Sequence, residues 1–286
     1  MDLIFSLLIN GLATGMLIFL LAAGLTLIFG LMSVLNFAHG GLFIWGAYTG
    51  VWFYQMTNSF FLGIIVAIIT GLLIGYVTER IIVRPVYGNH IQQILITLGF
   101  MLVLQELIKV VFGPQQIAVF PPEWLSGSFL VGDVVLIKYR LFIIAVGILV
   151  FAICMFILKK TRIGLIVRAG VINKEMVQSL GINIRLVFML VFMVGAALAA
   201  LSGILHAPYS GNLYAEMGLE FSILAFIVVV IGGMGSFTGS LLAALLVGLA
   251  QAFMAYYFPA LSLAVNMLLM TIVLVFRPQG LFRVKG

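Results

Sequence analysis

The chain has 286 residues, of which 64% are hydrophobic and 8% are charged, and its mean hydropathy is +1.32. Soluble domains usually carry about 25% charged residues, so a soluble protein is excluded. The net charge of +6 does not require nucleic acid, because basic residues kept on the cytoplasmic side of a membrane protein give the same sum. The length leaves no room for a second domain of ordinary size beside a membrane bundle, so residues 1–286 are predicted to form a single transmembrane domain.

Long charge-free stretches indicate the membrane spans. No Lys, Arg, Asp or Glu lies between Asp2 and Glu79 or between Glu220 and Arg277, whereas a spanning helix needs roughly 20 apolar residues and a central charge costs about 2.5–3.5 kcal/mol. The candidate spans are residues 3–29, 36–54, 60–78, 91–112, 141–158, 186–206, 219–234, 238–257 and 260–276. The predicted fold class is an all-α polytopic membrane protein with eight or nine transmembrane helices, nine if residues 219–236 span and eight if they are re-entrant.

The first span contains a pair of glycines one helical turn apart, and three further pairs follow along the chain. Such pairs allow close helix contact in lipid, where hydrophobic attraction between helices is absent. They are therefore candidate packing faces. The pairs are Gly11 and Gly15, Gly46 and Gly50, Gly71 and Gly75, and Gly235 and Gly239.

A polar, glycine-containing segment opens the second span. Asn36 can cap free backbone donors at a helix start, and Gly40 and Gly41 permit a backbone break beside a cavity. His39 in an apolar run is costly without a partner. Two interpretations stay open for these four residues, namely a packed, hydrogen-bonded histidine and a lining of a translocation path.

The charges outside the spans predict the orientation. Three basic clusters, Arg80 with Arg84, the loop of about residues 159–185 and residues 277–285, are cytoplasmic by the positive-inside rule. The loop of about residues 113–140 has no net charge and is predicted to lie outside, with a short hairpin over 129–137 that turns at Gly132 and Asp133. With nine spans the N-terminus lies outside and the C-terminus inside.

One carboxylate, Glu106, lies inside a predicted span, near the outer end of residues 91–112. Lys109 follows three residues later, at helical pairing distance, so a structural ion pair is favoured over an ion-coupling site. Gln92, Gln93, Gln251 and Asn266 are explained by hydrogen bonds inside the bundle. The sequence contains no Walker A loop, no paired cysteines and no zinc-protease or serine-hydrolase motif, so an energy source must lie outside the chain or in an ion gradient.

The long cytoplasmic loop contains a segment of mixed charged and apolar residues. Residues from Arg168 to Leu180 have helix-compatible composition with a stop at Gly181, and Glu175 and Met176 give the helix polar and apolar faces. This helix either lies on anionic headgroups or docks in a partner protein. A second glycine-rich interruption follows at Gly232 and Gly233, which predicts either a tight cytoplasmic turn or a discontinuous helix near the transport route.

Six motifs in order resemble the LivH family, the permease subunits of branched-chain amino acid ABC transporters. The motifs cover residues 35 to 282 and therefore essentially the whole chain. They are Leu35-Asn-Phe-Ala-His-Gly40, Glu79-Arg with Arg84-Pro85, Thr161-Arg-Ile-Gly164 before Arg168-Ala169, Glu175-Met with Leu180-Gly-Ile-Asn183, Gly232-Gly-Met-Gly-Ser236, and Arg277-Pro-Gln-Gly-Leu-Phe282.

The resemblance implies an ABC importer permease with a type II-like bundle in a prokaryotic cytoplasmic (inner) membrane. Its expected partners are membrane lipid, a second homologous permease, two cytoplasmic ATPase subunits that bind the ATP, and an extracytoplasmic substrate-binding protein; the chain itself carries no cofactor. The resemblance assigns Arg168, Glu175, Met176 and Gly181 to the coupling segment that contacts an ATPase.

The expected function is translocation of a branched-chain or similarly apolar amino acid, and the expected path residues are Asn36, His39, Gly40, Gly41, Gly232 and Gly233. Related permeases carry urea or short amides, so that cargo stays an alternative. An ion-coupled carrier acting alone and a polytopic membrane enzyme are less favoured, because the sequence offers neither deep carboxylates nor an acid, base or metal constellation.

Overall fold

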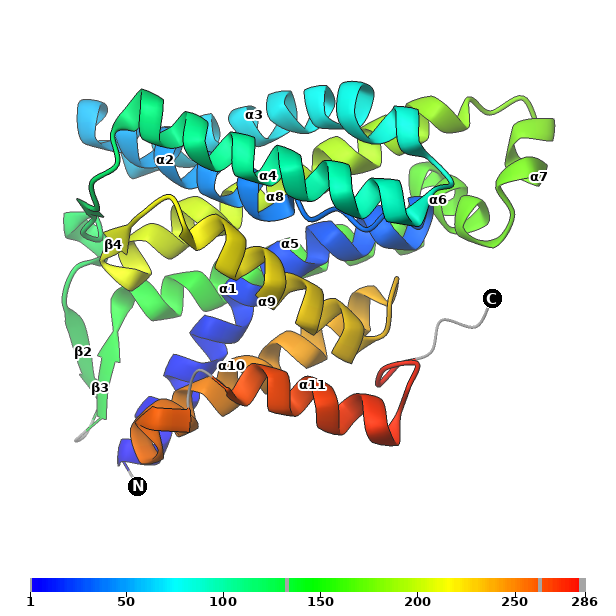
Figure 1. The fold of residues 1–286 in the computed structure, drawn as a ribbon. Coiled ribbons are helices and arrows are strands. Elements are labelled where there is room, and N and C mark those ends of the chain that lie inside the picture. Colours follow the sequence, from blue (N-terminus) through cyan, green and yellow to red (C-terminus); the bar gives the residue numbers. More distant parts are fainter. Residues whose placement is uncertain (1, 132–133, 262–263, 283–286) are drawn as a thin grey trace.

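The structure is a computed structural model that describes residues 2–131, 134–261 and 264–282, and it is a bundle of long helices (Figure 1). The helices are α1 (Asp2–Met32), α2 (His39–Thr57), α3 (Phe60–Val77), α4 (His90–Phe112), α5 (Lys138–Lys160), α6 (Arg162–Ile172), α7 (Lys174–Ser179), α8 (Ile184–Ser210), α9 (Met217–Gly232), α10 (Phe237–Tyr257) and α11 (Val265–Phe276). Short π- and 3₁₀-helical turns, η1 (Thr78–Val83) and η2 (Arg84–Val86), continue α3, and η3 (Glu123–Leu125) and η4 (Pro259–Leu261) lie in connections.

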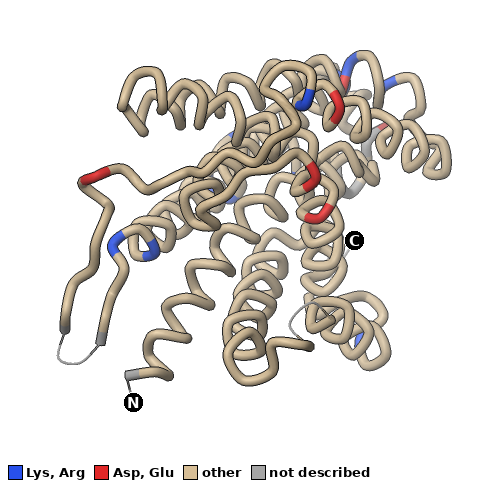
Figure 2. The backbone as a smooth tube through the Cα atoms, turned by 60° about the vertical axis from the view of Figure 1, so that its left-hand side comes forward, with Lys and Arg blue, Asp and Glu red and all other residues tan. Residues whose placement is uncertain are grey.

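Each of the nine predicted spans coincides with a helix. Six helical segments are long and apolar enough to cross a membrane, namely those that contain α1, α3, α4, α5, α8 and α10. The helices α9 and α11 are apolar but shorter, and α11 begins at Val265 rather than at residue 260 as the sequence predicts. Figure 2 shows that the charged residues gather in the connections and at the helix ends, which leaves long stretches of helix without charge.

Helix α2 lies inside the bundle, where α3, α4, α8 and α9 surround it. Eleven of its residues are buried, including Phe43, Tyr48, four glycines and one alanine. A helix that is covered by protein rather than by lipid does not need a continuous apolar surface, which explains why α2 is less apolar than its neighbours.

Three of the four predicted glycine pairs are packing faces, as predicted. A Cβ atom on Gly11 or Gly15 would meet Leu249 or Leu245 of α10, and one on Gly46 or Gly75 would meet Ala200 or Ala196 of α8. The fourth prediction is wrong. Gly235 lies in the turn before α10 with φ +87°, so it shares no helical face with Gly239.

The predicted outer loop and the link between α8 and α9 lie together at one end of the bundle, at the left of Figure 1. Strands β2 (Ser128–Val131) and β3 (Val134–Ile137) pair antiparallel, as the predicted hairpin requires, while its turn at 132–133 lies outside the described residues. Strand β1 (Ile117–Ala118) pairs with β4 (Asn212–Leu213), so the loop before α5 is joined to the link before α9. The predicted outer loop is thus bonded to the link between α8 and α9.

An ion-pair network reinforces this end. The Lys109 ammonium lies 3.0 Å from a Glu106 carboxylate oxygen and 2.9 Å from one of Glu216, which precedes α9. The predicted Glu106–Lys109 pair is therefore confirmed, and Glu216 extends it to a second helix. The hydrogen bond from Lys109 lowers the pKa of Glu216 below its usual value.

A buried carboxylate at the opposite end of the bundle corrects the prediction that Glu106 alone lies within a span. The helical run of α3 continues through η1, and Glu79 there is fully buried. Arg84 donates to both of its oxygens (3.2 and 3.0 Å), and the Tyr87 hydroxyl donates at 2.5 Å. Burial and the contact with Glu79 raise the pKa of Tyr87 far above its usual value. Glu79 is consequently a paired structural carboxylate.

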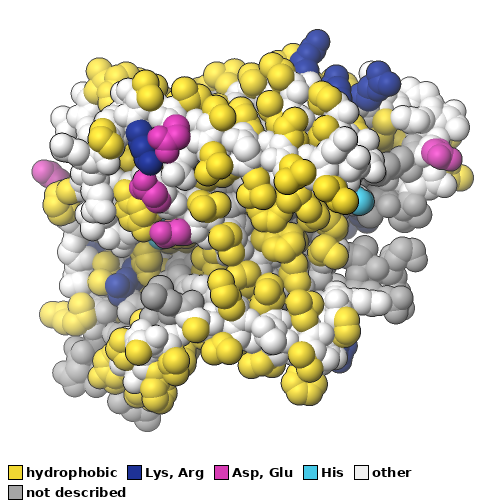
Figure 3. All heavy atoms as spheres, viewed as in Figure 1, with side chains coloured by type: hydrophobic (Ala, Val, Ile, Leu, Met, Phe, Trp, Pro, Cys, Tyr) yellow, Lys and Arg dark blue, Asp and Glu magenta, His cyan; other side chains and the backbone are white. Residues whose placement is uncertain are grey.

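Large apolar side chains cover much of the outside of the bundle, and Figure 3 shows charged side chains only near the two ends of one such face. Exposed examples include Leu95, Val110, Ile153 and Val275. In water such a surface would drive aggregation, whereas lipid tails solvate it. The fold is that of a multi-pass membrane protein.

Candidate functional site

The predicted path residues of the first interruption, the segment before and at the start of α2, lie deep in the protein. Residues 33–38 are not helical, and Asn36 is 2% exposed. Its Oδ1 atom accepts a hydrogen bond from the Ala38 backbone N–H (3.1 Å), one residue before α2 begins, and its Nδ2 atom has no partner. This bond lies in the loop ahead of α2, which has no side-chain cap, so the predicted helix cap by Asn36 is wrong; Asn36 instead closes a local turn and keeps an unpaired donor.

His39 is fully buried and contacts α1. Its Nε2 atom lies 2.9 Å from the Leu21 carbonyl oxygen, which accepts a hydrogen bond, and its Nδ1 atom is buried without a partner. The hydrogen bond supports the interpretation of a packed histidine. The unpaired Nδ1 atom keeps an interaction with a passing molecule open.

Gly40 and Gly41 permit close approach of neighbouring helices. A Cβ atom on Gly40 would collide with the Gly218 carbonyl oxygen of α9, and one on Gly41 would lie 2.5 Å from Leu104 of α4. These glycines are therefore required for packing whether or not they face a path.

Gly232 and Gly233 lie elsewhere: Gly232 ends α9, and Gly233 begins the tight turn that leads to α10. Gly233 has φ +97°, and the C-terminal segment docks on this turn: the Leu281 N–H donates to the Ile231 carbonyl (2.8 Å) and the Phe282 N–H to that of Gly232 (3.2 Å). The sequence leaves a tight turn and a discontinuous helix open at this position, and the structure contains the tight turn.

The predicted coupling segment is divided. The prediction of a single helix from Arg168 to Leu180 is wrong, because the chain forms α6 and α7 with Asn173 between them. Asn173 has extended backbone angles (φ −153°, ψ 102°), and its Oδ1 atom accepts from the Met176 N–H at 2.9 Å, so it caps α7. The predicted stop is confirmed, since Gly181 has φ +80° just after α7.

Helix α7 presents apolar side chains to its surroundings. Val177 is 2% exposed and anchors the helix on the bundle, whereas Met176 and Leu180 are 66% and 74% exposed. Glu175 is exposed on the same short helix, and Arg168 is exposed on α6. At the right-hand end of Figure 1, α7 extends away from the bundle.

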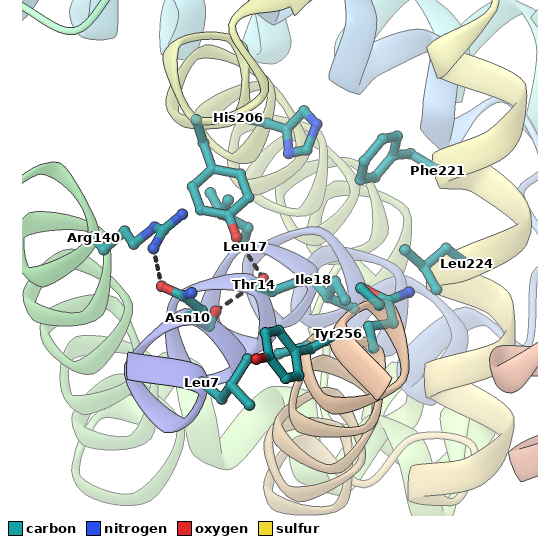
Figure 4. A pocket seen from close by; sticks show the side chains of 14 residues that line it. Leu7, Asn10, Thr14, Leu17, Ile18, Arg140, His206, Phe221, Leu224 and Tyr256 are labelled. Carbon is teal, nitrogen blue, oxygen red and sulfur yellow. Dashed lines mark hydrogen bonds between the residues drawn. The ribbon is translucent and has the colours of Figure 1, made fainter. Parts of the chain in front are cut away.

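A cavity lies at the same end of the bundle as the predicted outer loop, and sequence reasoning did not identify it. Its volume is about 540 Å³, within the roughly 300–1,000 Å³ of small-molecule sites. Figure 4 shows side chains of α1, α5, α8, α9 and α10 around it. The lining residues are Leu7, Asn10, Thr14, Leu17, Ile18, Arg140, His206, Tyr209, Phe221, Leu224, Gln251, Ala252, Ala255 and Tyr256.

One cation and several uncharged polar groups line this cavity. Arg140 donates to the Asn10 side-chain oxygen, and its guanidinium lies 5.9 Å from the centre of the Tyr209 ring. The Tyr209 hydroxyl is hydrogen-bonded to the Thr14 hydroxyl (2.7 Å). His206 is 9% exposed, packs against Phe221 at 4.4 Å between ring centres, and its Nδ1 atom has no partner.

The remaining wall is mainly apolar, and no Asp or Glu is among the lining residues. An arginine that faces an apolar wall without a fixed carboxylate suits a small apolar molecule that carries a carboxylate of its own. Arginine forms charge-assisted hydrogen bonds to such a group, and the apolar wall accommodates the rest of the molecule.

Of the predicted path residues, none lines this cavity. Gln251, which the sequence assigns to hydrogen bonding inside the bundle, lies in its wall and donates to the Asn266 side chain at 2.9 Å, so that prediction is confirmed. A signal for the cavity is present in the sequence, since Asn10 and Thr14 share a face of α1. Their partners on α5 and α8 are more than a hundred residues away.

Comparison with known proteins gives the family. The family described as branched-chain amino acid transport system / permease component matches residues 7–276. The chain is 32% identical to the high-affinity branched-chain amino acid transport system permease protein BraD of Pseudomonas aeruginosa, over 96% of this chain and 94% of BraD. It is 28% identical to LivH of Escherichia coli K12 (95% and 93% covered) and 27% identical to LivM of that strain (93% and 68% covered), both of which bear the same system's name.

A solved structure resembles this chain in its fold alone. PsaBC from Streptococcus pneumoniae, in complex with Fab, contains a chain that matches with a TM-score of 0.51 and 14% identity, over 93% of this chain and 89% of that one. The family match extends over almost the whole chain, and the similarity to BraD covers 94% of BraD. The chain therefore belongs to the family of permease components of branched-chain amino acid transport systems.

Proposed function

We propose that this permease takes up a branched-chain or similarly apolar amino acid through the outer cavity and passes it across a prokaryotic cytoplasmic membrane. The observation that carries the cargo is the cavity itself, in which Arg140 faces an apolar wall without a fixed carboxylate. The names of the relatives BraD and LivH support the same cargo. Urea and short amides carry no carboxylate, so they would leave the arginine without a charged partner.

Substitution of Arg140 tests this cargo. Leucine uptake by cells that express the intact system should fall about tenfold or more in Arg140→Gln, because a charged hydrogen bond contributes about 1.5–3 kcal/mol. Arg140→Lys is the matched control, because it keeps the charge and should retain part of the uptake. Equal leucine uptake by all three proteins, or a loss of uptake that appears for a neutral amide only, would contradict the amino acid cargo.

We further propose that ATP is bound and hydrolysed by two partner subunits that contact α7. The exposed apolar side chains of Met176 and Leu180 support a docking role for α7, which the buried Val177 holds on the bundle. Burial of such side chains in a protein contact lowers their free energy relative to water. Glu175 then faces a basic group of the ATPase. An extracytoplasmic binding protein supplies the substrate, and a second permease, as the similarity to both LivH and LivM supports, completes the path.

Variants of α7 test the docking. Met176→Asp should reduce co-purification of the ATPase and its stimulated hydrolysis, because it places a charge in an apolar contact, and Glu175→Arg should do so through like charges. Met176→Leu is the matched control and should behave as the native chain. Unchanged assembly and hydrolysis in both charged variants would favour the headgroup interpretation of this segment.

An ion-coupled carrier acting alone is the remaining alternative. The deepest carboxylate, Glu79, is bonded to Arg84 and Tyr87 and so offers no exchangeable site. Accumulation of leucine by the purified chain alone in liposomes with an ion gradient would overturn the proposal. No hydrolysis of ATP is expected from the chain alone.

A further inference from the structure

Two adjoining cavities lie at the cytoplasmic end of the bundle, which is the end opposite the outer cavity. The first, of about 240 Å³, lies between α1, α5, α6 and α10 and is lined by Lys159 and Arg168. The second, of about 290 Å³, lies between α1, α5, α6 and α8 and is lined by apolar side chains and one glycine. Leu27, Leu158 and Val167 line both cavities, so the two lie side by side.

The first cavity is positively charged. Lys159 and Arg168 are both exposed, no Asp or Glu is among its lining residues, and the three ion pairs found in the described part of the chain include neither cation. Such a pocket between membrane helices on the cytoplasmic side attracts an anionic headgroup.

The second cavity opens on the outside of the bundle. Four of its lining residues, Ile157, Ile163, Leu190 and Val194, are 40–63% exposed. A groove with no polar lining that faces outward within the membrane suits an acyl chain. A soluble anion such as free phosphate would fill the first cavity and leave this groove without an occupant.

We propose that the two cavities form one binding site for an anionic phospholipid, with the headgroup between Lys159 and Arg168 and an acyl chain in the groove beside Cys154. The shared residues Leu27, Leu158 and Val167 place the glycerol region between them. The lipid bridges α6, which precedes the α7 segment, to the membrane helices α5 and α8. This site stands independently of the cargo proposed above.

Lipid titration of the full-length chain in mild detergent, followed by native mass spectrometry, tests the site. Phosphatidylglycerol should bind about 30-fold more tightly than phosphatidylcholine, and the double variant Lys159→Gln with Arg168→Gln should lose that preference, about fivefold for each cation. The matched control is Lys160→Gln with Arg162→Gln, which removes the same charge from two exposed neighbours that do not line the cavity. Equal effects of the two double variants would overturn the proposal.

The groove is tested separately. Val194→Phe fills it without changing charge and should weaken phosphatidylglycerol binding, while inorganic phosphate should not compete. Cys154, the only cysteine of the chain, supplies a direct readout, since bound phosphatidylglycerol should slow its alkylation by N-ethylmaleimide. Unchanged binding in a folded Val194→Phe protein, or protection of Cys154 by added partner subunits in the absence of lipid, would contradict the lipid as occupant.

Discussion

Two glycine-rich interruptions in the chain look alike as sequence and differ as structure. The one at residues 33–41 is enclosed by helices and keeps two unpaired polar atoms, Asn36 Nδ2 and His39 Nδ1. The one at residues 232–236 is a turn, and the Ile231 and Gly232 carbonyl groups at its start accept hydrogen bonds from the C-terminal segment. Buried polar groups without partners are costly, so the first interruption is less well satisfied by the protein itself than the second.

The largest effect is expected from an added methyl group at the first interruption. Gly40→Ala should lower stability by about 3 kcal/mol or more, because its Cβ would overlap a backbone carbonyl oxygen of α9 that cannot rotate away. Gly99→Ala in α4 is the matched control, since nothing lies within 4 Å of that Cβ, and it should be neutral or gain about 0.5–1 kcal/mol. Thermal unfolding of the purified proteins gives both values, and equal unfolding temperatures would show that α2 and α9 do not approach so closely.

A smaller loss is expected at the second interruption. Gly233→Ala should cost about 2–3 kcal/mol, because φ is +97° and the Cβ would also meet the Phe282 carbonyl oxygen. Gly181→Ala shares a positive φ (+80°) but has open space around it, so it should cost about 1 kcal/mol. If the two variants unfold alike, the C-terminal segment does not pack on the turn.

Replacement of the histidine distinguishes packing from a path. His39→Leu should cost about 1 kcal/mol through the lost hydrogen bond to Leu21, and it should reduce leucine uptake if the unpaired Nδ1 atom serves the substrate. His90→Leu, at the exposed start of α4, should change neither. Normal uptake by His39→Leu would leave a purely structural histidine.

The smallest change in stability is expected for the asparagine. Asn36→Ala loses one hydrogen bond but also removes a buried unpaired amide, so the two effects largely offset each other. Asn89→Ala removes an exposed helix cap of the same chemistry and should cost about 1 kcal/mol. A larger loss for Asn36→Ala would mean that its Nδ2 atom has a partner in the membrane.

The helices could be predicted from the sequence because lipid imposes length and apolar composition on them. The predictions fail where a local side-chain bond, or a contact between residues far apart in the sequence, decides the structure. Asn173 divides α6 from α7 through its own side chain, an alternative that helix-compatible composition does not reveal. The sequence predicts Glu79 outside its span, because the apolar run ends before the π-helical turn η1 does.

The candidate site was less predictable than the fold. Asn10 and Arg140 are 130 residues apart, and Thr14 and Tyr209 are 195 residues apart, so periodicity along one helix cannot bring them together. His39 was identified as a residue that needs a partner, but its acceptor is a backbone carbonyl, which carries no sequence signal.

The pairing of β1 with β4 has a mechanical consequence. Together with the contact of Lys109 with Glu216, it fastens the connection that follows α4 to the connection that joins α8 and α9. A displacement of α9 relative to α8 at this end is therefore transmitted through backbone hydrogen bonds to α4 and α5. The connections at this end are consequently coupled mechanically, and a force applied to one of them would be distributed over four helices at once.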